Sequence, residues 1–151
     1  MKSIVLLAVS LFALHANAIT WQVFGPCDTK PVHQGKTEVD LSKSLGAVTV
    51  EILTQNQIPF VGTESGFNSI INTPTGIDAM EIVSQTELRA YGWCYSLNGK
   101  VPDVMPHEVQ LTSQKDHVIW FYAYTTNIKN QWQDDYCSPA YWIKAKQFCI
   151  R

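Results

Sequence analysis

Histidine and acidic side chains are the groups in this sequence that could carry out acid–base or nucleophilic chemistry. Beyond residue 18 the histidines are His33, His107 and His117. A nucleophile needs an adjacent base that a third group orients, and the chain has no Gly-x-Ser-x-Gly turn to present one. Asp134 and Asp135 are neighbours, so their side chains diverge on a regular element. We predict no catalytic residue and no enzymatic activity; a small hydrolase that uses His107 or His117 is the alternative.

The cysteines predict cross-links, not a metal site or a reactive thiol. There are four, Cys27, Cys94, Cys137 and Cys149, and an even count in a small exported domain is typical of a disulfide framework. Three pairings are possible. We prefer Cys27–Cys94 with Cys137–Cys149, because the second pair closes a short loop around an aromatic tail. The chain has neither a Cys-x-x-Cys spacing nor a glycine-rich phosphate loop, so we predict no metal and no cofactor.

Residues 1–18 have the composition of a cleavable signal peptide. Lys2 gives a positive start, an uncharged and mostly apolar run covers residues 4–14, and residues 16–18 (Ala-Asn-Ala) form a small-x-small cleavage site. A membrane anchor is the weaker alternative, because the run makes only about 16 Å of helix, about half the hydrocarbon core of a bilayer. We therefore expect a secreted or periplasmic protein without stable membrane insertion.

The remaining residues, 19–151, are enough for one domain with a hydrophobic core. Ten lysine and arginine side chains against thirteen acidic ones give this part a net charge of about −3. A protein without a basic excess is a poor partner for nucleic acid. Residues from about 125 to 151 form a C-terminal extension rich in cysteine and aromatic residues, which we expect to pack back onto the domain.

Aromatic side chains alternate along two predicted strands. In Tyr91–Leu97 the odd positions, among them Trp93 and Tyr95, share one face, and Trp120 lies on the even-numbered face of Val118–Tyr124. The second of these strands is apolar on both faces, as a central strand is. Either the rings form the core, or they form an exposed surface that stacks on a flat ligand or a partner protein. On the second interpretation Trp93, Tyr95 and Trp120 are candidate ligand-binding residues.

The rest of the pattern predicts an α+β domain. Apolar residues at helical spacing, a possible serine cap and Pro59 predict one helix over residues 42–57, although Gly46 is a poor helix former. Asn98-Gly99 is a strong β-hairpin signal. The order of elements indicates a mixed or antiparallel β-sheet with the helix packed on one face. The other expected strands cover residues 20–25, 36–41, 58–61, 67–71, 79–88, 108–111 and 118–124.

Two motifs and one segment carry a family resemblance. YGWCYSLNGK at residues 91–100 is an aromatic strand that ends in Asn-Gly, DHVIWFY at 116–122 is close to Asp-x-Ile-x-Trp-x-Tyr, and GFNSIIN at 66–72 contains Ser-Ile and Asn. With these features, residues 20–124 resemble the C-terminal domain shared by transcobalamin and intrinsic factor, and the bacterial transcobalamin-like domains. The predicted helix lies where that family has its single helix.

The resemblance implies a small α+β fold somewhat like a β-grasp, without enzymatic activity. In the eukaryotic carriers this domain closes over cobalamin beside a large helical domain, and its Ser-Ile-Asn segment touches the ligand, which implies Ser69, Ile70 and Asn72 as binding residues here. We expect no helical domain in this protein, and Lys115-Asp116 replaces the family's Gly-Asp. We therefore predict an exported, non-catalytic binding module for a small flat ligand, corrinoid-like in one interpretation, or for a partner molecule. A structural, protein–protein interaction or inhibitor module of the cell envelope is the alternative.

Overall fold

The structure, a computed structural model, describes residues 18–149. Over this range the chain forms a mixed sheet of seven strands, a two-stranded hairpin and one long helix, which confirms the predicted α+β class. The predicted signal peptide lies outside the described residues except for Ala18. None of the helices between residues 18 and 149 is long and apolar enough to cross a membrane.

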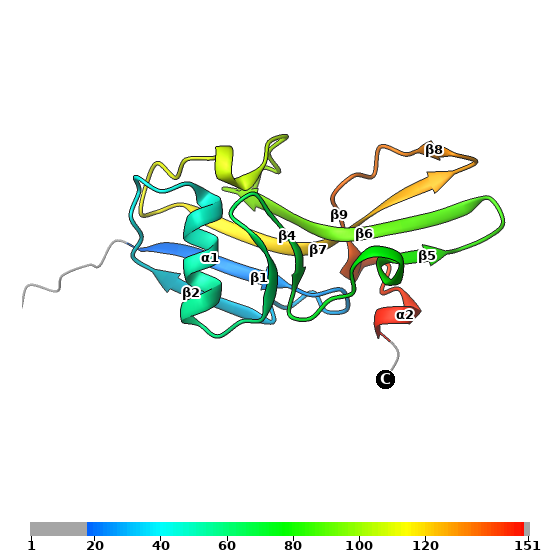
Figure 1. The fold of residues 1–151 in the computed structure, drawn as a ribbon, viewed down its shortest axis with the longest axis horizontal. Coiled ribbons are helices and arrows are strands. Elements are labelled where there is room, and N and C mark those ends of the chain that lie inside the picture. Colours follow the sequence, from blue (N-terminus) through cyan, green and yellow to red (C-terminus); the bar gives the residue numbers. More distant parts are fainter. Residues whose placement is uncertain (1–17, 150–151) are drawn as a thin grey trace, which may run out of the picture.

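Strand β7 lies at the centre of the sheet, whose order is β2-β1-β7-β6-β5 (Figure 1). β1 runs parallel to β7, whereas the β6–β7 pair is antiparallel and extends over eleven residue pairs. β9 also pairs with β7, at Ala123 and Tyr124, and β8 pairs with it at its C-terminal end. The prediction of a central strand that is apolar on both faces is confirmed. The strands are β1 Ile19–Phe24, β2 His33–Thr37, β5 Met80–Ile82, β6 Glu87–Leu97, β7 His117–Ile128, β8 Gln131–Trp132 and β9 Ser138–Pro139.

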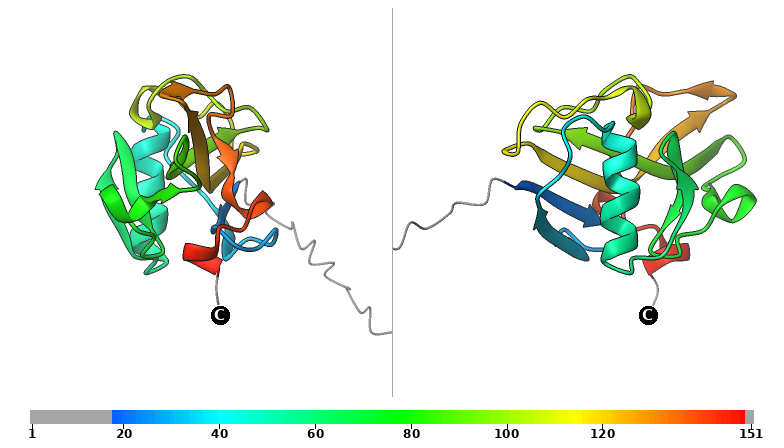
Figure 2. Two further views of the ribbon diagram at one scale, coloured as in Figure 1. Left: turned by 90° about the vertical axis from the view of Figure 1, so that its right-hand side faces the viewer. Right: turned by 60° about the vertical axis from the view of Figure 1, so that its left-hand side comes forward.

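One face of the sheet is covered by helix α1, Leu45–Gln55, and by the hairpin of β3, Phe60–Thr63, and β4, Gly66–Ile70 (Figure 2). The helix lies within the predicted range 42–57 and begins three residues later, at Leu45, because the Ser44 hydroxyl caps it by accepting the N–H of Ala47 at 3.2 Å. Its apolar stripe is buried in the core. The buried side chains of the stripe are Leu45, Val48, Ile52 and Leu53.

Gly46 makes room for the hairpin on the helix. A Cβ added at Gly46 would lie 1.9 Å from the main-chain oxygen of Glu64, in the turn between β3 and β4. Gly46 weighs against a helix in the sequence, but a glycine is needed at this position because the two backbones pack closely there.

The core has two parts. The larger lies between the sheet, α1 and the β3–β4 hairpin, and contains Trp120 in edge-to-face contact with Phe67, with ring centroids 4.8 Å apart. The smaller surrounds the fully buried Tyr122. There Phe148 packs edge-on against Tyr91 at 4.7 Å between centroids. The C-terminal extension thus packs back onto the domain, as predicted.

Several predicted strands have other limits in the structure: β3 lies at Phe60–Thr63 instead of 58–61, β6 begins at Glu87 and β7 ends at Ile128. Two further differences are larger. The second strand covers His33–Thr37 and not residues 36–41. The residues that pair with β1 are 33–37, and residues 38–41 do not join the sheet. Residues 79–88 do not form one strand. The chain turns between β5 and β6, where the N–H groups of Val83 and Ser84 donate to the carbonyl of Glu87.

The predicted strand at residues 108–111 is wrong, because no strand forms there. A 3₁₀ turn over Pro106–Glu108 precedes it, and the segment makes only a single bridge, between Gln110 and Ser44. Pro106 favours the turn, because the fixed φ of proline suits the first position of a helical turn and proline has no N–H for a strand ladder.

The preferred disulfide pairing is also wrong. The bonds join Cys27 to Cys149 and Cys94 to Cys137. Cys94 lies in β6. Cys137 directly precedes β9, and β9 pairs with β7, which is the neighbour of β6 in the sheet. The pairing follows from this contact between strands, which the spacing of cysteines along the chain does not reveal.

Replacement of Gly46 by alanine should destabilise the protein, although alanine is the better helix former. We expect a loss of about 1–3 kcal/mol in the free energy of unfolding, measured in urea, because the added methyl group meets the Glu64 carbonyl. Gly92→Ala is the control, since its Cβ would have no atom within 4 Å. Equal stability of Gly46→Ala and wild type would contradict the packing described.

Peptide mapping without reduction should recover Cys27 linked to Cys149 and Cys94 linked to Cys137. Replacing Cys94 and Cys137 together by alanine should lower the free energy of unfolding by about 2–5 kcal/mol, because a loop of 43 residues is no longer closed. Recovery of a Cys27–Cys94 peptide would contradict the fold of the C-terminal extension.

Candidate functional site

A cleft of about 410 Å³ lies at the outer edge of β6, beside Trp93 and Tyr95. Its walls are the start of β4, the loop of residues 101–108, and Tyr136 of the C-terminal extension, and Trp120 of β7 adds to its lining. The volume is within the usual range of small-molecule sites, about 300–1,000 Å³. We refer to it as the β6-edge cleft.

Along the cleft, the outward-facing main-chain N–H and C=O groups of β6 have no partner strand. The N–H of Asn98 donates to the carbonyl of His117 at 2.8 Å, so this pair is hydrogen-bonded across β6 and β7. In an antiparallel ladder such pairs alternate, and the even residues of β6 therefore bond to β7. The N–H and C=O groups of Trp93 and Tyr95 point the other way. Between residues 18 and 149 these four groups have no hydrogen-bonding partner.

The chain begins to fill this outer edge and then leaves it. Asn98 and Gly99 form the predicted hairpin turn, with φ of 52° and 80°, and Lys100 exchanges two hydrogen bonds with Leu97, at 2.8 and 3.1 Å. Continued pairing would place Pro102 opposite Tyr95, and proline has no N–H to donate. The hairpin therefore stops after one residue pair, and the loop turns outward to become a wall of the cleft.

The three aromatic residues predicted for ligand binding lie together in this cleft. The Nε1–H of Trp93 donates to Thr73 at 2.7 Å, the hydroxyl of Tyr95 to the carbonyl of Val104 at 2.6 Å, and the Nε1–H of Trp120 to Thr49 at 3.2 Å. Tyr95 and Trp120 are 6% and 3% exposed and belong to the core, and Trp93 is partly buried. Because each polar atom is bonded internally, the rings are fixed, and Trp93 presents more apolar surface to the cleft than the two core rings do.

The residues implied by the family resemblance do not line the cleft. Ser69 is buried and donates to the carbonyl of Thr73 at 2.7 Å, and Ile70 is fully buried. Asn72 is exposed in the turn after β4, with a φ of 59°. Ser69 supports the site indirectly, because its bond to Thr73 orders the residue that holds the indole of Trp93.

Carboxylates give the cleft a negative character. Asp103 and Glu108 line it, and no lysine or arginine does so among residues 18–149. One carboxylate oxygen of Glu108 accepts the N–H of Met105 at 2.9 Å. Burial raises the pKa of the Tyr95 hydroxyl, and the nearby charges of Glu108 and Tyr136 add to the effect. Tyr95 therefore stays neutral at physiological pH.

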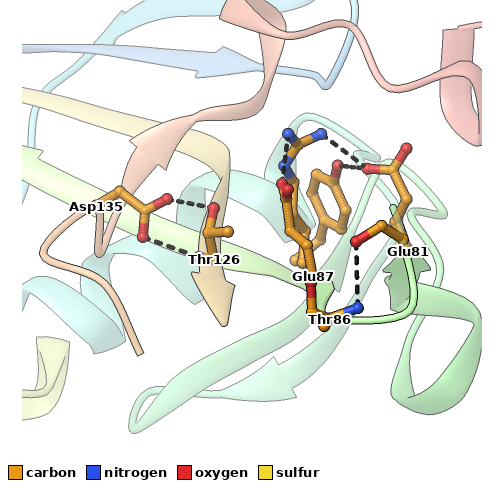
Figure 3. Close-up of polar contacts among 8 residues, drawn as sticks. Glu81, Thr86, Glu87, Thr126 and Asp135 are labelled. Carbon is orange, nitrogen blue, oxygen red and sulfur yellow. Dashed lines mark hydrogen bonds and ion pairs between the residues drawn. The ribbon is translucent and has the colours of Figure 1, made fainter. Parts of the chain in front are cut away.

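The wall formed by Tyr136 is held by its neighbours in the chain. Asp135 accepts the N–H of Thr126 at 2.8 Å and also the hydroxyl of Thr126 (Figure 3). Burial acts to raise the pKa of Asp135, but the bonds from Thr126 and Thr125 outweigh it, and the pKa is lowered. On the other side of Tyr136, Cys137 is bonded to Cys94 of β6. Tyr136 itself is 74% exposed, and its neighbours Asp135 and Cys137 are both held in place.

At its other end the open edge of β6 is closed by β5. Glu81 of β5 accepts the hydroxyl of Tyr91 and forms an ion pair with Arg89, and both of these lie on β6 (Figure 3). Arg89 also pairs with Glu87, at 3.1 Å. Burial raises the pKa of Tyr91, and the bond to Glu81 adds to it. This cluster fixes β5 opposite Leu88–Ala90 and defines the limit of the cleft edge.

None of the histidines between residues 18 and 149 lines the cleft. Nδ1 of His117 is 2.7 Å from the hydroxyl of Thr20, in a polar depression of about 480 Å³ on β1 and β2. In the part of the chain that the structure describes, no carboxylate hydrogen-bonds this imidazole, so the third member of a catalytic triad is missing there. His107 lies in the 3₁₀ turn beside Glu108 and His33 is exposed on β2. Across residues 18–149 no group of three or more His, Cys, Asp and Glu side chains could hold a metal ion.

The sequence did not predict the loop and tail residues of the cleft. Val101, Val104, Met105 and Tyr136 are exposed apolar or aromatic side chains around its mouth. A signal for the loop was present in Pro102 and Pro106, which follow a strong hairpin turn and prevent its strands from continuing. No local signal marks Tyr136, because the disulfide partner of its neighbour Cys137 decides its position.

Comparison with known proteins gives little further information. No protein-family model matches this chain, and no curated protein matches it. A crystal structure from Ruminococcus gnavus ATCC 29149, described as a "putative metal binding protein", is similar over 70% of this chain and 94% of that chain, at 17% identity and a TM-score of 0.44. A similarity this low carries no argument about function, and the transcobalamin-like resemblance stays a prediction.

Replacing Asp135 with asparagine should loosen the Tyr136 wall in a pH-dependent way. A carboxylate whose pKa is lowered by folding stabilises the native state above its ordinary pKa of about 3.9, and the contribution disappears as the pH falls through the folded value. We expect Asp135→Asn to be less stable than wild type by about 1–2 kcal/mol at pH 7, and the difference to shrink as the pH falls below the ordinary pKa of an aspartate, in urea unfolding at each pH. The exposed neighbour Asp134→Asn is the control. A pH-independent difference would contradict the assignment.

Proposed function

We propose that this protein is an exported, non-catalytic binding module that holds an apolar or aromatic part of its ligand in the β6-edge cleft. The observation that carries the proposal is that Trp93, Tyr95 and Trp120, from two neighbouring strands, line one cleft with an exposed apolar rim. Concave sites with fixed aromatic walls and few polar groups are typical of ligand sites. The leader pattern of residues 1–18 and the two disulfides support export.

A flat ligand fits the same observations. The rings of Tyr95 and Phe67 lie 5.0 and 4.8 Å from that of Trp120 and are nearly buried. The aromatic surface open to a ligand therefore comes from the partly buried Trp93 and the exposed Tyr136. A corrinoid is one member of this class, which the family resemblance suggests. The alternative of a structural or inhibitor module is supported by exposed apolar side chains outside the cleft, among them Ile77, Ile82 and Trp132.

Replacement of Tyr136 by alanine should weaken binding in the cleft without affecting the fold. We suggest titrating ¹⁵N-labelled protein with a panel of flat aromatic compounds that includes cyanocobalamin, and following amide shifts around Trp93, Tyr95 and Met105. For a compound that binds, Tyr136→Ala should raise Kd about five- to tenfold, because an exposed aromatic wall is worth about 1 kcal/mol or more in binding.

Trp132→Ala is the matched control, since Trp132 is an exposed aromatic residue of the same C-terminal extension that does not line the cleft. Binding that shifts amides elsewhere, or that responds to Trp132→Ala and not to Tyr136→Ala, would contradict the proposed site.

A further inference from the structure

We propose that the ligand of the β6-edge cleft is an extended peptide segment of a partner protein, which adds to β6 as an antiparallel strand. This inference rests on the proposed function and names its ligand class. A peptide bound in this way makes main-chain hydrogen bonds to an open sheet edge and places alternate side chains in pockets on either side of it.

The outer edge of β6 has a strand position that is filled at both ends and open in the middle. β5 occupies it opposite Leu88–Ala90, and Lys100 occupies it opposite Leu97. The open stretch between them, residues 91–96, is about 20 Å long at ~3.3 Å per residue. It therefore has room for a strand of about five residues. Both flanking segments run antiparallel to β6, and the proposal gives the added strand the same direction.

The open stretch offers the hydrogen-bonding groups that such a strand needs. The N–H and C=O groups of Trp93 and Tyr95 face outward, and none has a partner between residues 18 and 149. A small flat molecule could cover the aromatic rings but would leave these alternating donors and acceptors unmatched. An extended peptide supplies acceptors and donors with the same spacing.

Depressions lie on both sides of the open edge. The β6-edge cleft extends along Trp93 and Tyr95, and a second depression of about 210 Å³ extends along Gly92, whose side-chain position points to the opposite face. Trp93, Cys94 and Cys137 line both. A Cβ at Gly92 would meet no atom within 4 Å, so this side is open. Side chains of an added strand that alternate between faces would enter the two depressions in turn. Tyr136 lines both.

The shape and charge of the site favour a single extended chain over a second folded copy. The loop of residues 101–108 and the Tyr136 segment flank the open edge, and in a symmetric pair of β6 edges these walls would meet each other. The carboxylates of Asp103 and Glu108, without a lysine or arginine in the lining, favour a segment that carries positive charge beside its apolar residues.

Capped peptides of the form Lys-Thr-Xaa-Thr-Xaa-Thr-Lys, with leucine, valine, phenylalanine or tryptophan at both Xaa positions, test the proposal by calorimetry. In an antiparallel pair the residues that bond to Trp93 and Tyr95 have their side chains on the same face as these residues, which is the cleft face. N-methylation of both Xaa residues should therefore weaken binding about tenfold or more, because it removes the donors that face β6. N-methylation of the central threonine, whose N–H faces away, is the matched control and should change Kd less than threefold.

The other outcomes separate this inference from the proposed function. If cyanocobalamin or another flat compound binds the cleft and the peptides do not, or if both kinds of N-methylation are equally harmful, the strand-addition proposal is wrong and the binding module stands. If no compound and no peptide binds, both fail. If sedimentation shows self-association that a peptide reverses, the occupant is a second copy of this chain and the proposal is overturned.

Peptides with glutamate in place of lysine should bind more weakly at low salt, because the cleft is lined by Asp103 and Glu108.

Discussion

Main-chain N–H and C=O groups need hydrogen-bonding partners on both sides of a strand, and this requirement is only partly met in β6. On one side β7 satisfies it along eleven residue pairs. On the other side β5 and Lys100 satisfy it only at the ends. The candidate site exists because the middle of this edge is open. The loop of residues 101–108 and the Tyr136 segment are the walls of a cleft only because no strand lies between them.

The open edge is kept accessible but protected. Exposed sheet edges promote aggregation, and proteins commonly cover or recess them. Here the hydroxyl of Tyr95 ties the loop at Val104 on one side, and the Cys94–Cys137 bond with the Asp135–Thr126 contacts fixes the tail on the other. Different forces hold the two walls, a neutral hydrogen bond for one and a covalent and charged anchor for the other. The loop and the tail therefore flank the open edge on both sides.

Features set by neighbouring residues could be predicted from the sequence. The helix with its Ser44 cap, the apolar central strand and the Asn98-Gly99 turn follow from periodicity and turn chemistry, and the structure has all three. The three aromatic residues singled out for binding also lie in one cleft, although two of them are core residues. Alternation along a strand shows which side chains share a face, but not which of them are covered.

Features set by contacts between distant segments could not be predicted in this way. The disulfide pairing depends on β9 lying beside β7, and the position of Tyr136 depends on that pairing. Residues 108–111 have the alternation of a strand, but they make only a single bridge, between Gln110 and Ser44. Ser69 and Ile70 were implied by resemblance, and the structure buries both beneath the site. The buried Asp116 accepts bonds from Asn98, Thr112 and Ser113, so a motif residue with no evident role in the sequence anchors the hairpin loop.

Residue-resolved amide hydrogen exchange of the unliganded protein tests the central claim most directly. The account predicts an alternation along β6, in which the amides of Gly92 and Cys94, bonded to β7, exchange slowly and those of Trp93 and Tyr95 exchange much faster. Equally slow exchange of Trp93, Tyr95 and Cys94 would show that the outer edge is already paired, and would contradict an open strand position as the basis of the site.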